Sequence, residues 1–269
     1  MILDPITDPF AGEIARRALT EVLLLAAICG PLGVWVVLYR QSYAAESVAH
    51  AALPGLVLAS VAGFPLLLGA AAGLVVAAVA VGLVGRARGV DSDSAVAVLV
   101  TTMFGAGVIL ALSPDTPARL GEILFGDPLG VSYEDILATA ILGVLVFAGL
   151  TRFHRRLSLV GFDSQSAPVL GASPAATEIV LLVLLALTIL IAVQALGNLL
   201  VIALILAPGA AALRVGRRLP AAMALSVAFA AGAGLAGLYA SHYLHIAAGA
   251  AIALAAVVTF AVTLPRRAA

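Results

Sequence analysis

The sequence has little charge and contains no lysine. Only 10% of its 269 residues are charged, and 14 arginines balance 14 acidic residues, so the formal net charge is zero. A soluble domain carries about 25% charged residues, so this composition argues against a soluble globular protein. The balanced charge also offers no basic footprint for nucleic acid, and we expect no nucleic-acid partner.

Cysteine and the common catalytic motifs are also scarce or absent. The single cysteine, Cys29, lies inside an apolar run, so we expect a small buried side chain and no intrachain disulfide. The sequence has no GxxxxGKS/T phosphate loop, no HExxH helix and no GxSxG elbow. These absences argue against nucleotide hydrolysis by this chain, and we expect a protein that is not an enzyme.

Apolar stretches of membrane-spanning length make up most of the chain. The sequence is 63% hydrophobic with a mean hydropathy of +1.18, and about 20 apolar residues suffice for one crossing. We therefore predict an all-α, polytopic transmembrane helix bundle of eight to nine helices. It forms a single domain over 18–269, after a polar N-terminal arm over 1–17. The expected crossings are 19–38, 47–63, 65–84, 95–112, 134–151, 177–194, 198–213, 221–240 and 246–264.

The arginines are distributed unevenly between the two sides of this bundle. With nine crossings, three lie on one side (Arg16, Arg17, Arg119) and eleven on the other (Arg40, Arg86, Arg88, Arg152, Arg155, Arg156, Arg214, Arg217, Arg218, Arg266, Arg267). Because basic residues gather in cytoplasmic loops, we predict a multi-pass protein of the cell membrane with a cytoplasmic C-terminus. The other side collects acidic residues in the arm and around 113–135. Such a surface attracts cations or a basic partner, although solvated loops are often acidic as well.

Prolines interrupt two of the expected helices. Pro54 lies in the short 47–63 stretch and Pro208 in the 198–213 stretch. Backbone groups freed by proline cannot face lipid, so we expect both sites to face protein or a water-filled path. The 47–63 helix should be kinked or buried. Each of these prolines has two interpretations. It lines a transport route, or it has no special role, because prolines are common in membrane helices.

Glu46 and His50 are ionisable residues at membrane depth, four positions apart. An ionisable group there costs about 2.5–3.5 kcal/mol on insertion scales, so such residues point to function. On a helix both side chains lie on one face, and a carboxylate with an imidazole suits a divalent transition metal. Two ligands are too few, but two copies on a two-fold axis supply four. The spacing equally allows a hydrogen bond between Glu46 and His50 without metal.

A second histidine pair lies near the C-terminus. His242 and His245 fall in the turn between the last two expected helices. They bind an incoming metal ion or are solvated residues of an exposed turn.

The longest basic connection runs from 152 to 174. Its stretch from Phe162 to Ala167 is able to start a short helix, with Asp163 or Ser164 as the cap. This helix docks on a cytosolic partner, or the segment is an ordered connecting loop.

Three segments carry a resemblance to a known family. ESVAHAALPG at 46–55 resembles the family's acid-x-x-Ser-His-Ala-x-Leu-Pro-Gly signature, and ILFGDPLGVS at 123–132 and LLVIALILAPGAAA at 199–212 are similar to two further stretches. The family is that of the membrane permeases of ATP-binding-cassette (ABC) importers for manganese and zinc. The likeness extends over nearly the whole chain.

The resemblance implies a homodimeric or heterodimeric permease, driven by a separate cytosolic ABC ATPase and supplied by an extracytoplasmic metal-binding protein. It implies no permanently bound cofactor, and the cargo is a manganese or zinc ion, with iron as a further option. By position, Glu46 and His50 match the acid and the histidine with which the family coordinates the ion. The segment from Phe162 to Gly171 looks like the one that docks on the ATPase, with Phe162, Asp163, Ala167 and Gly171 as its candidate residues.

The chain departs from the family pattern at five positions. Glu46 stands where Asp is usual, Ala49 replaces Ser, Gly209 replaces Ala, and His242 and His245 replace Tyr and Asp. The longer Glu side chain shifts the ligand oxygen outward by about one methylene, and the two extra imidazoles bias metal capture toward zinc.

Two alternatives to an ion permease are open. One is a permease for a metal chelate, a siderophore or a cobalamin-like ligand, against which the aromatic content of 6% argues mildly. The other, from a different class, is an intramembrane enzyme or a passive channel.

Overall fold

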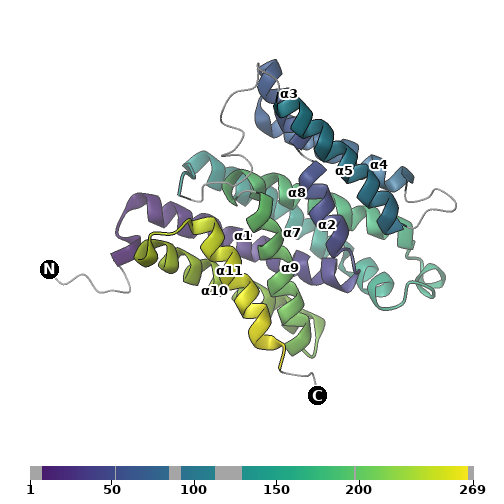
Figure 1. The fold of residues 1–269 in the computed structure, drawn as a ribbon. Coiled ribbons are helices and arrows are strands. Elements are labelled where there is room, and N and C mark those ends of the chain that lie inside the picture. The colour runs from purple at the N-terminus through teal and green to yellow at the C-terminus, as the bar shows by residue number, and fades with distance from the viewer. Residues whose placement is uncertain (1–7, 52, 85–91, 113–128, 197, 266–269) are drawn as a thin grey trace.

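The computed structural model describes residues 8–51, 53–84, 92–112, 129–196 and 198–265. The regular structure in these ranges is helical (Figure 1). Each of the nine expected crossings contains helical residues there, so the predicted all-α helix bundle is confirmed. The elements are η1 (Asp8–Phe10), α1 (Glu13–Leu38), α2 (Ser42–Ala51), α3 (Leu53–Ala62), α4 (Leu66–Val84), α5 (Ser92–Ala111), α7 (Tyr133–Phe162), η2 (Ala167–Leu170), α8 (Pro174–Leu196), α9 (Asn198–Val215), α10 (Leu219–Leu244) and α11 (Ala248–Thr263).

Two helices extend beyond their apolar stretches. Helix α1 begins at Glu13, within the expected polar arm, and α7 continues to Phe162, past the expected end of its crossing at 151. At its start α7 has a capping box: the Ser132 side chain accepts the Asp135 N–H, and the Asp135 carboxylate accepts the Ser132 N–H. Hydropathy marks the part of a helix that lies in lipid, whereas helical hydrogen bonding continues beyond it.

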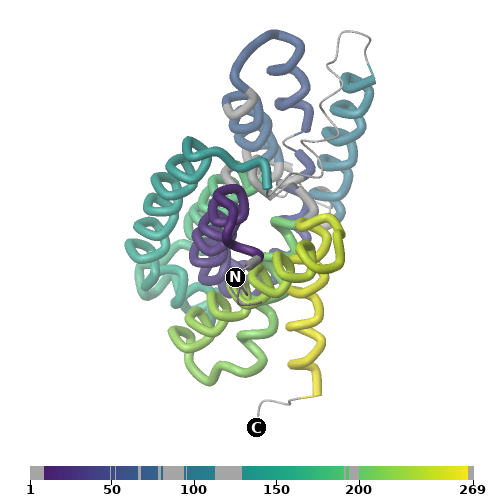
Figure 2. The backbone as a smooth tube through the Cα atoms, turned by 90° about the vertical axis from the view of Figure 1, so that its left-hand side faces the viewer, coloured from purple at the N-terminus to yellow at the C-terminus, as the bar shows by residue number. Residues whose placement is uncertain are grey.

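Helix α1 forms the centre of the bundle. It packs against α7, α8, α9 and α10, which surround it in Figures 1 and 2. Its Leu25, Leu32 and Trp35 are fully buried, and Cys29 is buried as predicted. The outer surface is also apolar, because large apolar side chains such as Val144 on α7 are exposed. Such an exterior suits contact with lipid.

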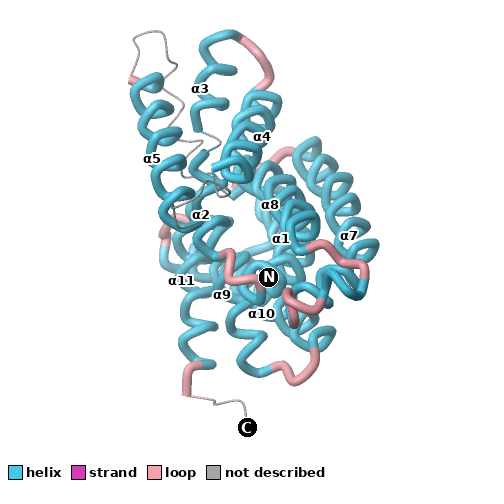
Figure 3. Tube along the Cα trace, turned by 90° about the vertical axis from the view of Figure 1, so that its right-hand side faces the viewer, coloured by secondary structure: helices cyan, strands magenta, loops and turns pink. Residues whose placement is uncertain are grey.

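Helices α3, α4 and α5 form a separate layer that projects from one side of the bundle (Figure 3). Helix α2 lies where this layer meets the rest, because it touches α4 and α5 on one side and α8 and α9 on the other. A residue on α2 is therefore placed between two groups of helices.

The 47–63 stretch is helical on both sides of residue 52, in α2 and in α3. Pro54 lies in α3. It is half-buried against α5, because a Cβ added at Gly107 would lie 3.0 Å from the Pro54 nitrogen. The expected interruption thus faces protein on at least one side.

Helices α1 and α9 approach each other at glycines. A Cβ at Gly33 would overlap the carbonyl oxygen of Ile205, and a Cβ at Gly209 would lie 2.6 Å from the carbonyl carbon of Gly33. Pro31 in α1 and Pro208 in α9 lie close to these glycines in the sequence, and both prolines are buried. The expectation that the Pro208 interruption faces protein is met, and Pro31 adds a second case that the sequence reasoning did not single out.

We predict that Gly33→Ala lowers stability by about 1–3 kcal/mol, because the new methyl group forces α1 and α9 apart. The measurement is the loss of helical circular dichroism on heating the purified protein in detergent. Gly232→Ala in α10 is the matched control, since a Cβ there meets nothing within 4 Å. Equal melting temperatures for the two variants would contradict the prediction.

Candidate metal site and coupling segment

Helix α2 carries both predicted metal ligands. Its first turn is closed by a hydrogen bond from the Ala45 N–H to the Gln41 carbonyl (2.9 Å). Glu46 and His50 both line one cavity of about 230 Å³ between α2 and α5. The shared face expected from their spacing is therefore confirmed, and metal binding by this pair stays a prediction.

The wall of this cavity that α2 forms is polar, and the wall that α5 forms is largely apolar. Helix α5 contributes Phe104, whose ring meets the His50 ring edge to face with the centroids 5.3 Å apart. Glu46 is exposed and His50 is half-buried. A carboxylate and an imidazole are thus presented together, and Phe104 limits the orientations open to the imidazole. The lining residues are Tyr43, Glu46, Ser47 and His50 from α2 and Val100, Thr101 and Phe104 from α5.

The lining of the cavity suits a cation, because its described residues bring a carboxylate and an imidazole together and include no Lys or Arg. In the ranges that the structure describes, no group of three or more His, Cys, Asp or Glu side chains could hold a metal ion. This part of the chain therefore offers two such side chains at the cavity, not a closed cage.

The second histidine pair lies at the end of α10. His242 is exposed and packs edge to face on Tyr243, with the ring centroids 5.0 Å apart. His245 is also exposed and ends the helix in the left-handed region at φ 54°. Neither residue lines the cavity of Glu46 and His50.

The coupling segment, which we define as 162–171, follows the end of α7. Ala167 is buried against Val160 and Ala172, so the segment is held onto the helix that precedes it. Gly171 ends η2 at φ 78°, a conformation that favours glycine. By contrast, Phe162 is 69% exposed. Other large apolar side chains in this segment also point outward, namely Val169 and Leu170.

Asp163 stabilises the turn at the start of this segment. Its Oδ1 accepts the backbone N–H groups of Ser166 (3.0 Å) and Gln165 (3.1 Å). The Ser166 side chain first, and then the backbone N–H groups of Ser166 and Gln165, hold the pKa of the Asp163 carboxyl below its usual range by hydrogen bonding. Of the two caps expected from the sequence, Asp163 accepts the hydrogen bonds that close this turn.

The sequence reasoning missed Glu21, a second acidic residue at membrane depth. It lies inside the apolar run of α1, is fully buried, and accepts a hydrogen bond from the Thr139 hydroxyl of α7 (2.6 Å). Its Oε2 has no hydrogen-bond partner among the described residues. An acidic residue within an apolar run was the signal that should have drawn attention to it.

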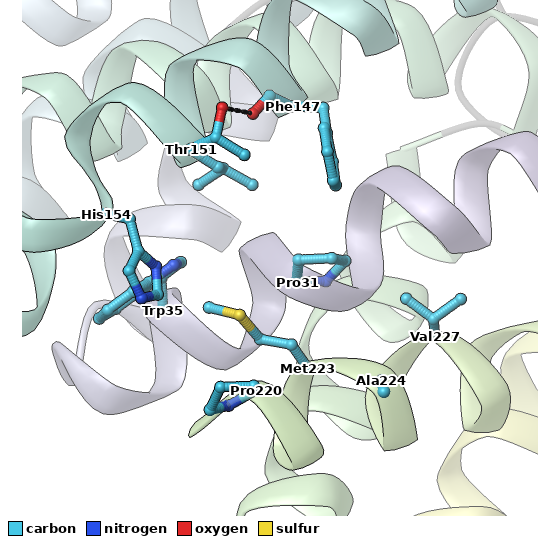
Figure 4. A pocket seen from close by; sticks show the side chains of 10 residues that line it. Pro31, Trp35, Phe147, Thr151, His154, Pro220, Met223, Ala224 and Val227 are labelled. Atoms are coloured by element: carbon cyan, nitrogen blue, oxygen red, sulfur yellow. Dashed lines mark hydrogen bonds between the residues drawn. The ribbon is translucent and has the colours of Figure 1, made fainter. Parts of the chain in front are cut away.

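A larger cavity, of about 510 Å³, lies between α1, α7 and α10 (Figure 4). Its walls are mostly apolar, and the Thr151 hydroxyl there bonds to the Phe147 carbonyl of its own helix (3.0 Å). His154 packs edge to face on Trp35 in this wall, with centroids 5.6 Å apart. With a single imidazole and no carboxylate in its lining, this cavity is a poorer metal site than the one on α2.

The fold and its apolar surface define a multi-pass helical membrane protein. Residues 11–266 match the ABC 3 transport family, and the chain belongs to this family. It is 34% identical over 247 residues to the manganese transport system membrane protein MntC of Halalkalibacterium halodurans, covering 91% of this chain and 85% of that one. It is 31% identical over 264 residues to the chelated iron transport system membrane protein YfeD of Yersinia pestis, covering 98% and 89%.

A solved structure gives the same result. The chain superimposes on PsaBC from Streptococcus pneumoniae in complex with Fab with a TM-score of 0.86 at 27% identity, covering 98% of this chain and 95% of that one. The resemblance found in the sequence motifs is therefore confirmed. The chain is a membrane permease subunit of an ABC transport system and is not itself an enzyme, which removes the intramembrane-enzyme alternative.

We predict that Asp163→Ala speeds amide hydrogen exchange at Gln165 and Ser166, because both lose their acceptor. Asp163→Asn is the control, since its amide oxygen still accepts. Because the folded pKa is lowered, this stabilisation is present above the ordinary Asp pKa and is lost only as the pH falls through the lowered value. Exchange as slow in the alanine variant as in the asparagine variant would refute the role of the carboxylate.

Proposed function

We propose that this chain is the permease subunit of an ATP-driven importer that moves a divalent transition-metal ion, manganese, zinc or iron, into the cytoplasm. The observation that carries the proposal is the single cavity that Glu46 and His50 share on α2. Carboxylate and imidazole are ligands for these ions. The names of the relatives, a manganese and a chelated iron transport protein, lend support.

The metal site is completed by a second permease subunit. Two such side chains are too few to hold an ion alone, but a copy or a related chain related by a two-fold axis brings its own pair. Two ligand pairs from two subunits bind the ion strongly enough for it to enter the site and weakly enough for it to leave. Alternating access then moves the ion from one side of the bilayer to the other.

The coupling segment docks on a cytosolic ABC ATPase. Exposed Phe162, Val169 and Leu170 lie beyond the apolar part of α7, where an apolar surface suits a protein partner better than water. The basic residues of the same connection place it in the cytoplasm by the positive-inside rule, together with the C-terminus.

An extracytoplasmic metal-binding protein docks on the opposite, acidic side. Asp115, Glu122 and Asp127 of this expected surface lie outside the described residues. His242 and His245 are candidates for the capture of an incoming ion there, since both side chains are exposed.

Size argues for an ion rather than a chelate. A cavity of about 230 Å³ is smaller than the roughly 300–1,000 Å³ of pockets that enclose drug-sized ligands. A siderophore or a cobalamin-like ligand needs a wider path with more aromatic surface.

We predict that Glu46→Ala and His50→Ala each lower metal uptake by about 10–100-fold or more, because loss of even an outer partner of a metal ligand has an effect of that size. Cells that express the whole transporter are assayed by elemental analysis, which also identifies the metal. Glu46→Asp keeps the carboxylate and should retain most uptake. Thr20→Ala is the control, because the Thr20 side chain is exposed on α1 and its hydroxyl donates to the Arg16 carbonyl of the same helix (2.9 Å). Wild-type uptake by both alanine variants would remove this pair from the mechanism.

We also predict that free manganese or zinc ions, delivered with the binding protein, stimulate ATP hydrolysis by the reconstituted transporter. An iron–siderophore complex or cobalamin should leave the rate unchanged, because the cavity is too small for either. Stimulation by a chelate and not by any free ion would favour the alternative. Transport by the purified permease alone would favour a passive channel.

A further inference from the structure

The turn that joins α1 to α2 is short and fully hydrogen-bonded. The Tyr39 N–H donates to the Trp35 carbonyl (2.9 Å), and the Gln41 N–H donates to the Val36 carbonyl (3.0 Å). Arg40 takes the left-handed conformation at φ 58°. Helix α2 begins at Ser42, directly after Gln41. A displacement of this turn therefore moves the start of α2.

Tyr39 ties this turn to the end of α7. Its ring packs on Val160, Ala167 and Ala172, the cluster that holds the coupling segment, and its hydroxyl donates to the Leu157 carbonyl (2.9 Å). Burial, and then the charge of Glu178, raises the pKa of Tyr39 to about 12. The hydroxyl therefore remains protonated, and able to donate, throughout the physiological range.

Gln41 ties the same turn to the start of α8. Its Nε2 donates to Oε1 of Glu178, which lies seven residues beyond Gly171 in the chain. The two helices that flank the coupling segment are thus each attached to one turn, α7 through Tyr39 and α8 through Gln41.

The metal-ligand candidates follow immediately on α2. Glu46 and His50 are five and nine residues after Gln41, which is about 7.5 and 13.5 Å along a helix. A helix of this length moves as a rigid rod, because its backbone hydrogen bonds link every turn.

We propose that Tyr39 and Gln41 are positioning residues that transmit the movement of the coupling segment to Glu46 and His50. The proposal rests on the proposed function, which places the ATPase on the coupling segment and the metal on α2. ATP-driven displacement of 162–171 pulls on the 39–41 turn, and α2 moves its two ligands with it. The release of metal is thereby coupled to the state of the ATPase.

The test uses the complete transporter, permease with ATPase and binding protein, reconstituted in liposomes. Gln41→Glu places two carboxylates opposite each other and breaks the link. Combining it with Glu178→Gln restores the hydrogen bond with the donor and acceptor exchanged. The readout is metal transported per ATP hydrolysed, which a loss of folded protein does not change.

We expect Gln41→Glu to lower this ratio about fivefold or more, the range of ordinary allosteric coupling, and the exchanged pair to recover most of it. Tyr39→Phe, which keeps the ring and removes the hydroxyl, should lower the ratio as well. Tyr133→Phe is its matched control, because that hydroxyl bonds to Glu13 in another part of the fold (3.2 Å).

Three results would overturn the proposal. They are an unchanged ratio in Gln41→Glu, a lowered ratio that the exchanged pair does not recover, and an equal loss in the two tyrosine variants. Glu46→Ala, assayed in parallel, distinguishes failure of the proposed metal site from failure of the proposed link. Wild-type transport by Glu46→Ala refutes the proposed metal site, whereas its loss together with a normal ratio in Gln41→Glu refutes the link alone.

Discussion

The absence of water around most of this chain is the constraint on which its structure depends. Hydrocarbon offers no hydrogen bonds, so several polar side chains in the apolar helices form hydrogen bonds within the protein. The hydroxyls of Thr102 and Thr188 each bond to the carbonyl four residues earlier in their own helices. Glu21 shares a hydrogen bond with Thr139 across two helices. Glu46 differs from these groups, because its carboxylate is exposed and lines a cavity.

The same constraint explains how the helices are held together. Lipid is as apolar as the side chains, so burial of apolar surface from water does not drive one helix onto another within the bilayer. Close contact then depends on small residues, as at Gly33 and Gly209 between α1 and α9, and at Gly55 and Gly69 between α3 and α4. The close approach of α1 to α9 follows from the first of these contacts.

Hydropathy, helical period and three motifs in the sequence were enough to predict the all-α bundle, the shared face of Glu46 and His50, and the family. These features depend on neighbours in the chain, and local composition and spacing encode them. The limits of helices were less accurate: α1 begins at Glu13 and α7 reaches Phe162, because helices continue past the lipid that hydropathy detects.

Only the tertiary structure decided which distant residues meet. The contact of Phe104 with His50, the burial of Glu21 beside Thr139, and the attachment of Gln41 to Glu178 join residues 54, 118 and 137 positions apart. Nothing in the local sequence specifies these partners, because each depends on how whole helices pack. In a chain rich in Ala, Leu, Val and Gly, many packings share the same pattern along the sequence. Steric fit of side chains in three dimensions selects one of them.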